Sequence, residues 1–232
     1  MWIIYTDPHH PHIPLEIGYR VIKSARICHD YDRITGYCRD GCPDYGSGGC
    51  PPHAPAIAEA AQKNPHAILI YARFLSRFKP VEIARDDFSV QDNVLSNFLN
   101  QLGYAVMADY KDYLFFMTCG HCQGCGEEAC SYILGEENCR HPQRRAYSVA
   151  GTGIDVTATL KDVFDITLQW IRGEKQAEYI IKVIGLLSQE AGMPTMIGQQ
   201  LIAVINRLEC IKWPVGSPEA RCFLKAAQIE ED

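Results

Sequence analysis

Apolar residues along this chain follow two patterns, the spacing of amphipathic helices and the short continuous runs of buried strands. The longest helical pattern covers residues 81–102, and Gly103 would end this helix as a C-terminal cap. Its apolar face would consist of Val94, Leu95, Phe98 and Leu102. Helices are expected at 17–31, 54–64, 81–102, 156–171 and 194–209.

The continuous runs predict strands between these helices. Residues 66–74, "HAILIYARF", form a buried strand, and residues 104–119 form two strands around "DYKD". Residues 177–189 suit either a strand or a helix, because they are rich in β-branched side chains and also long enough for a helix. The order of elements predicts an α+β fold: a small mixed sheet flanked by helices, with two cysteine-rich loops. We expect a cysteine-rich domain over residues 1–190 and a helical C-terminal extension over 191–232.

Composition narrows the classes of function. The chain has 232 residues, a net charge of −6 and a pI of about 5.7, which argues against nucleic acid as the main partner. Its longest apolar runs are far shorter than the roughly 20 residues that span a bilayer, and no signal peptide is evident. We therefore expect a cytoplasmic protein without membrane insertion. No P-loop, dinucleotide-binding glycine motif or serine-hydrolase elbow is present.

Cysteine usage is the strongest chemical signal. Of eleven cysteines, eight lie in two short stretches, whereas Cys28, Cys210 and Cys222 stand apart. In a reducing compartment, clustered cysteines more often bind metal or carry redox chemistry than form disulfides.

The second stretch, "TCGHCQGCGEEACSYILGEENCRHP", has its first three thiols at C-x2-C-x2-C spacing. This spacing is typical of bacterial ferredoxin loops that hold an iron–sulfur cubane. We expect Cys119, Cys122 and Cys125 to be ligands, with Cys139 as the preferred fourth ligand and Cys130 as its competitor. A zinc site and thiols without metal are the alternatives.

The first stretch, "YCRDGCPDYGSGGCPPHAP", places Cys38, Cys42 and Cys50 at C-x3-C-x7-C spacing in a loop stiffened by proline. It predicts a second metal centre, either a cubane or a zinc site of three cysteines and a histidine. Cys50 could instead complete the cluster that begins at Cys119. The proposed sources of a fourth ligand are Cys28, His29, His53 and the N-terminal histidines His9, His10 and His12.

Together, these motifs resemble a family of uncharacterised, predicted metal-binding proteins common in anaerobic bacteria and archaea. The resemblance rests on "CRDGCPDYGSGGCPPHAP" and on "CGHCQGC" followed by "CRHPQRRAYSVAGTGIDVTATL", and covers roughly residues 20–190. The metal ligands that it implies are Cys38, Cys42, Cys50, Cys119, Cys122, Cys125 and Cys139. The resemblance implies metal binding but no particular reaction.

Some residues near the motifs have two interpretations. Asp155 is expected to cap a helix rather than to act in catalysis, and Cys210 and Cys222 are expected to be incidental thiols. A basic group beside the last cysteine would either tune a cluster or form a solvated loop: Arg140, His141, Arg144 and Arg145.

These observations favour an iron–sulfur protein with one or two [4Fe–4S] clusters that transfers electrons in anaerobic metabolism. The first alternative is an enzyme whose three-cysteine cubane leaves one iron open to substrate. The second alternative is a zinc-stabilised adaptor of a larger complex. A redox protein or a larger oxidoreductase complex is the expected partner.

Overall fold

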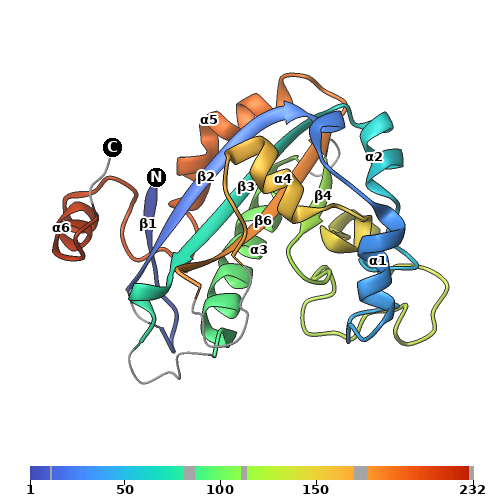
Figure 1. Ribbon diagram of the computed structural model, residues 1–232, viewed down its shortest axis with the longest axis horizontal. Helices are drawn as coiled ribbons and strands as arrows, with labels where there is room; N and C mark the ends of the chain where they lie inside the picture. Colours follow the sequence, from blue (N-terminus) through green and yellow to red (C-terminus); the bar gives the residue numbers. More distant parts are fainter. Residues whose placement is uncertain (11, 81–86, 111–113, 170–176, 230–232) are drawn as a thin grey trace.

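The computed structural model describes residues 1–10, 12–80, 87–110, 114–169 and 177–229. It confirms the predicted α+β class: six strands form one mixed sheet in the order β1-β2-β3-β6-β4-β5, flanked by helices (Figure 1). All neighbouring strands are antiparallel except β4 and β5, which are parallel. The elements are β1 (Trp2–Tyr5), β2 (Ile13–Lys23), η1 (Ser24–Arg26), α1 (Tyr31–Arg39), α2 (Ile57–Lys63), β3 (His66–Leu75), η2 (Ser76–Phe78), α3 (Ser89–Tyr110), β4 (Phe115–Thr118), η4 (Pro142–Arg144), β5 (Tyr147–Ser148), η5 (Ala150–Thr152), α4 (Val156–Phe164), β6 (Tyr179–Ser188), α5 (Met193–Ile205) and α6 (Pro218–Ala226).

The central strand β3 is buried on both faces, which explains its continuous apolar sequence. Ile68, Ile70 and Phe74 face a core shared with α3 and α5. Ala67 and Leu69 face a second core shared with α2 and α4. Figure 1 shows α4 and α3 on opposite faces of the sheet.

Several predicted elements are confirmed. Residues 57–63 and 193–205 are helical, and residues 66–75 form a strand. The ambiguous segment 177–189 is a strand, β6, because it pairs with β3 along its whole length. The helix expected at 156–171 is shorter in the structure: α4 ends at Phe164, and Asp165 follows it in a left-handed conformation (φ 57°). Residues 170 and 171 of the expected helix lie outside the described ranges.

Three local predictions are wrong. Residues 17–23 belong to β2 rather than to a helix, because they pair with β3 and continue the sheet. Residues 104–110 continue α3 rather than forming a strand, since Val106 and Met107 are buried in its core. Gly103 lies inside this helix, where a Cβ atom would come 2.1 Å from Cζ of Phe116. The predicted start at 81–86 and the last two residues of "DYKD" lie outside the described residues.

Helix α5 packs into the main core through Ile197, Leu201 and Ile205, so part of the expected C-terminal extension lies against the sheet. Helix α6 packs separately against Ile4 of β1. The division at residue 190 stays a prediction. None of the helices within the described ranges has the length and hydropathy needed to cross a bilayer.

Candidate metal centres

Four cysteines from both stretches line one cavity of about 300 Å³. Cys38 lies in the last turn of α1, Cys42 and Cys50 lie in the loop that follows, and Cys119 comes directly after β4. We call these four residues the first cysteine set. The set lies where the sheet narrows: β4 pairs with β6 only at residues 185–187, and residues 181–183 of β6 form one wall of the cavity.

The volume of this cavity exceeds the volume that a single metal ion would fill. Its volume is about ten times the roughly 30 Å³ that one water molecule occupies in the liquid. Within the described ranges, no three histidine, cysteine or acidic side chains lie close enough together to hold a single metal ion. The four thiols of the first set therefore contribute to the wall of a cavity that is wider than a site for one ion.

The thiols of this set lie in a weakly polar environment. Burial is the main cause that raises the pKa of Cys50 to about 11; a hydrogen bond with Ser47 opposes the rise, and the charges of Asp44, Cys42 and Cys38 contribute to it. Burial also raises the pKa of Cys119 to about 11, whereas the positive charge of Lys182 opposes that rise. Deprotonated thiols at this position would therefore need a compensating positive charge, as a metal supplies.

Asn100 positions Cys119 from α3. Its Oδ1 lies 3.5 Å from Cys119 Sγ and its Nδ2 lies 3.5 Å from the Cys119 carbonyl oxygen. The Thr118 hydroxyl donates to the same Oδ1. Asn100 is buried, so these contacts satisfy polar atoms that have little access to water. The sequence analysis did not identify Asn100 as part of a site, because this residue lies outside the apolar face formed by Val94, Leu95, Phe98 and Leu102.

The remaining four cysteines of the two stretches form a second cysteine set: Cys122, Cys125, Cys130 and Cys139. Burial raises the pKa of Cys125, and the charges of Cys130, Cys139 and Cys122 raise it further, in that order. Cys125 thus lies within electrostatic reach of the other three thiols. Ser131 is completely buried, and its hydroxyl has no hydrogen-bond partner in the described part of the chain.

Backbone N–H groups point at the sulfurs of the second set. Cys122 Sγ accepts from Gly124 at 3.4 Å and from Ala146 at 3.3 Å. Cys130 Sγ accepts from Gly48 at 3.2 Å. Such hydrogen bonds stabilise thiolates and are one means by which proteins tune iron–sulfur clusters.

Residues Gly48 and Gly49 of the first stretch lie against the second set. A Cβ atom on Gly49 would come 2.4 Å from the Ala146 carbonyl oxygen and 2.7 Å from Cβ of Cys122. Only glycine allows this approach, so the glycine pair of "YGSGGC" brings the two sets together. Figure 1 shows the second stretch, in yellow-green, beside α1.

Arg145 also connects the first cysteine stretch to the second. Its guanidinium donates to the Gly48 carbonyl oxygen at 2.7 Å and to the His53 carbonyl oxygen at 2.8 Å. It also lies 5.0 Å from the ring centroids of Tyr132 and Tyr147. Arg145 is therefore a structural residue between the stretches, whereas Arg140 forms ion pairs with acidic residues of its own loop.

The predicted grouping of Cys119 with Cys122 and Cys125 stays a prediction. In the structure, Cys119 lines the cavity of the first set, because β4 ends at that cavity. This placement agrees with the alternative in which Cys50 and Cys119 share a centre. Cys130 and Cys139, predicted as competitors, both lie near Cys125. Metal ligation by any of these residues stays a prediction.

The other suggested ligands lie outside both sets. Cys28 Sγ is directed to the Arg26 carbonyl oxygen, and the ring of His53 packs on Tyr132 at 4.2 Å between centroids. His29 Nδ1 contacts a neighbouring backbone oxygen. The N-terminal histidines lie near β1, at the opposite edge of the sheet from β4 and β5: His10 pairs with Asp7, and His12 stacks on Trp213.

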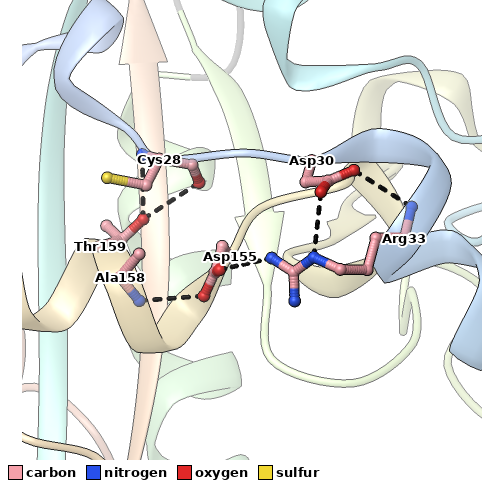
Figure 2. Close-up of polar contacts among 6 residues, drawn as sticks. All are labelled: Cys28, Asp30, Arg33, Asp155, Ala158 and Thr159. Atoms are coloured by element: carbon pink, nitrogen blue, oxygen red, sulfur yellow. Dashed lines mark hydrogen bonds and ion pairs between the residues drawn. The ribbon is translucent and has the colours of Figure 1, made fainter.

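Asp155 caps α4, as its position in the sequence predicts. Its carboxylate accepts from the Ala158 N–H at 2.9 Å and pairs with Arg33 at 2.6 Å (Figure 2). Asp30 caps α1 and binds the same arginine. Figure 2 also shows Cys28 tied to Thr159 through its backbone, with its sulfur pointing away.

A family model described as "Predicted metal-binding protein (DUF2284)" matches residues 20–187. The chain belongs to this family. The match includes both cysteine sets of this DUF2284 protein and confirms the resemblance inferred from its motifs. It supports metal binding without naming the metal. No curated protein and no solved structure matches the chain.

Proposed function

We propose that this protein binds two [4Fe–4S] clusters and transfers electrons. The observations that carry the proposal are that four cysteines line one cavity and that Cys125 lies within electrostatic reach of three others. Cys38, Cys42, Cys50 and Cys119 would hold one cluster, and Cys122, Cys125, Cys130 and Cys139 would hold the other. Four thiolates are the usual ligands of a [4Fe–4S] cluster.

The surroundings of each set suit such a group. The first set lines a cavity of several atoms' volume, and Lys182, which pairs with Asp92 at 2.7 Å, lines the same cavity. The second set has backbone N–H groups aimed at two of its sulfurs. When bound, each cluster would supply one-electron chemistry, and the backbone N–H groups at the second set would stabilise negative charge on its sulfurs.

The placement of Cys119 favours a relay over an open-iron enzyme. Three cysteines alone would leave one iron free for substrate, but a fourth thiol lines the same cavity. The zinc adaptor remains the second candidate, since four thiolates also suit structural zinc. The metal content of the protein separates these candidates.

An electron carrier requires a donor and an acceptor, so we propose a redox protein or an oxidoreductase complex as its partner. All eleven cysteines are free thiols, which suits a reducing cytoplasm. Sensitivity of exposed clusters to oxygen would suit anaerobic metabolism.

The first test is the content of iron, zinc and acid-labile sulfide in protein purified without oxygen. About eight irons and eight sulfides per chain are expected, with a brown colour that dithionite bleaches. Zinc without sulfide, in a colourless protein that a chelator unfolds, would contradict the proposal and support the adaptor.

A further inference from the structure

We infer that a second cavity, beside the first cysteine set, binds a small uncharged planar aromatic molecule. This cavity has a volume of about 750 Å³, within the roughly 300–1,000 Å³ range of small-molecule sites. It lies between α1 and the start of α4. Four residues line both this cavity and the cavity of the first set: Cys38, Cys42, Ala150 and Val156.

The cavity forms beside the place where two backbone segments meet, which we call the junction. The backbones of residues 28–30 and 153–155 run antiparallel, with Asp30 N–H donating to Gly153 O and Asp155 N–H donating to Cys28 O, each at 2.9 Å. Helices α1 and α4 both begin at this junction (Figure 2). Gly153 has φ 84°, and a Cβ atom there would come 2.6 Å from Cα of Tyr31. The positions of both helices are therefore fixed by contacts within the chain.

The charges at this junction disfavour an anionic ligand. Arg33 is the basic residue of the lining, but its Nη2 lies 2.6 Å from Asp155 and its Nε lies 3.0 Å from Asp30. One positive charge therefore faces two negative charges. A carboxylate or phosphate in the cavity would add a further negative charge beside these two carboxylates, whereas an uncharged ligand would not.

The remaining walls favour a flat, apolar molecule. Apolar side chains line the cavity from three segments: Ile34, Tyr37, Ile154, Val156 and Leu168. Tyr37 is 68% exposed, although aromatic side chains usually bury most of their surface. Its ring offers a face or edge for stacking, which is the preferred contact between aromatic groups.

A molecule in this cavity would contact the side chains of Cys38 and Cys42. It would therefore lie against the first centre, where it could change that centre's surroundings. The inference rests on the proposed function for the identity of this centre, while the cavity itself is formed by the protein chain alone.

The test uses 2-naphthol as the neutral probe and 2-naphthoate as its anionic counterpart. Titration calorimetry at pH 7 under anaerobic conditions should give a dissociation constant about tenfold lower for 2-naphthol. Thr157→Trp places a large side chain at an exposed position of the lining and should abolish binding. Tyr37→Ala, at the exposed position on α1, should weaken binding several-fold. Ile202→Ala, on the exposed surface of α5, is the matched control and should bind like the wild type.

A second variant tests the role of charge. Asp155→Asn keeps a side chain that caps helices well but removes one negative charge beside Arg33. It should therefore reduce the preference for 2-naphthol over 2-naphthoate several-fold. Equal or tighter binding of 2-naphthoate by the wild type would overturn the inference, as would the absence of binding in a folded protein.

The result of these binding tests can be distinguished from the result of the metal analysis that tests the proposed function. A protein that lacks iron but binds 2-naphthol as predicted would retain the cavity and contradict the cluster proposal. A protein with eight irons that binds neither probe would support the cluster proposal and contradict the inferred aromatic ligand. If both hold, 2-naphthol should alter the electron paramagnetic resonance signal that Cys50→Ser removes, and an unchanged signal would overturn the contact with the first centre.

Discussion

The backbone N–H of Gly48 donates a hydrogen bond to Sγ of Cys130 at 3.2 Å, across 82 residues of sequence. Gly48 comes two residues before Cys50 of the first set, whereas Cys130 belongs to the second set. The two cysteine stretches therefore form one structural unit.

The proposal that Cys119 shares a cluster with Cys38, Cys42 and Cys50 gives the most specific prediction. In Cys119→Ser, the anaerobically purified protein should retain about half of its iron, because one set of four thiolates remains intact. Its paramagnetic signal should match that of Cys50→Ser. Cys122→Ser should instead match Cys139→Ser. Iron analysis and electron paramagnetic resonance spectroscopy measure these results.

Cys222→Ser is the control, since Cys222 is exposed on α6 and outside both sets. It should retain the full iron content. A Cys119→Ser spectrum that matches Cys122→Ser and differs from Cys50→Ser would show that the sequence-based grouping was right.

Gly49→Ala should disrupt the second set without removing a thiol. The new methyl group would come 2.4 Å from the Ala146 carbonyl oxygen, so the backbone must move away from Cys122. We expect iron loss from the centre that Cys122→Ser also removes. Gly36→Ala in α1 is the matched control, because a Cβ atom there would meet no atom within 4 Å beyond the neighbouring helix backbone. This substitution should stabilise the helix by up to about 1 kcal/mol. Full iron retention in Gly49→Ala would contradict the packing described for these loops.

Arg145→Lys should lower the free energy of unfolding by about 2 kcal/mol, since hydrogen bonds from charged groups are among the stronger ones. A lysine ammonium lacks the planar fork that reaches the carbonyl oxygens of Gly48 and His53 together. Urea denaturation of the metal-loaded protein measures the change. The neighbouring exposed Arg144→Lys should shift stability by less than about 0.5 kcal/mol. Equal effects of both variants would argue against a structural role for Arg145.

Asp155→Ala should cost about 1 kcal/mol of stability at pH 7, the usual loss when a helix cap is removed. The pKa of Asp155 is lowered, first by the Ala158 N–H and then by Arg33. The carboxylate therefore stabilises the fold above its ordinary pKa, and this contribution is lost as the pH falls through the lowered value. The difference between wild type and variant should shrink below about pH 4.

Urea denaturation at several pH values provides this measurement. Asp32→Ala, in the first turn of α1, serves as the control, because Asp32 is exposed and does not cap the helix. A difference between wild type and Asp155→Ala that grows on acidification would contradict the assigned cap.

Sequence patterns predicted elements well where one periodicity dominated. The strand at 66–74 and the apolar face of α3 follow from local spacing and burial. The same reasoning failed at residues 17–23, whose strand conformation depends on pairing with β3, more than forty residues away. It also failed at Gly103, which a local rule takes for a helix end but which lies in α3 under Phe116.

The sequence by itself determined that this protein carries cysteines at metal-binding spacings, and that its fold combines a β-sheet with helices. Those properties depend on residue types and short spacings. Only the tertiary structure decided that Cys119 lines a cavity together with cysteines of the first stretch, and that Arg33 lies between two helix caps. Both depend on where distant segments end and meet: β4 stops beside the first loop, and residues 28–30 pair with 153–155. Contacts of this kind arise from packing across the whole chain, which no local pattern records.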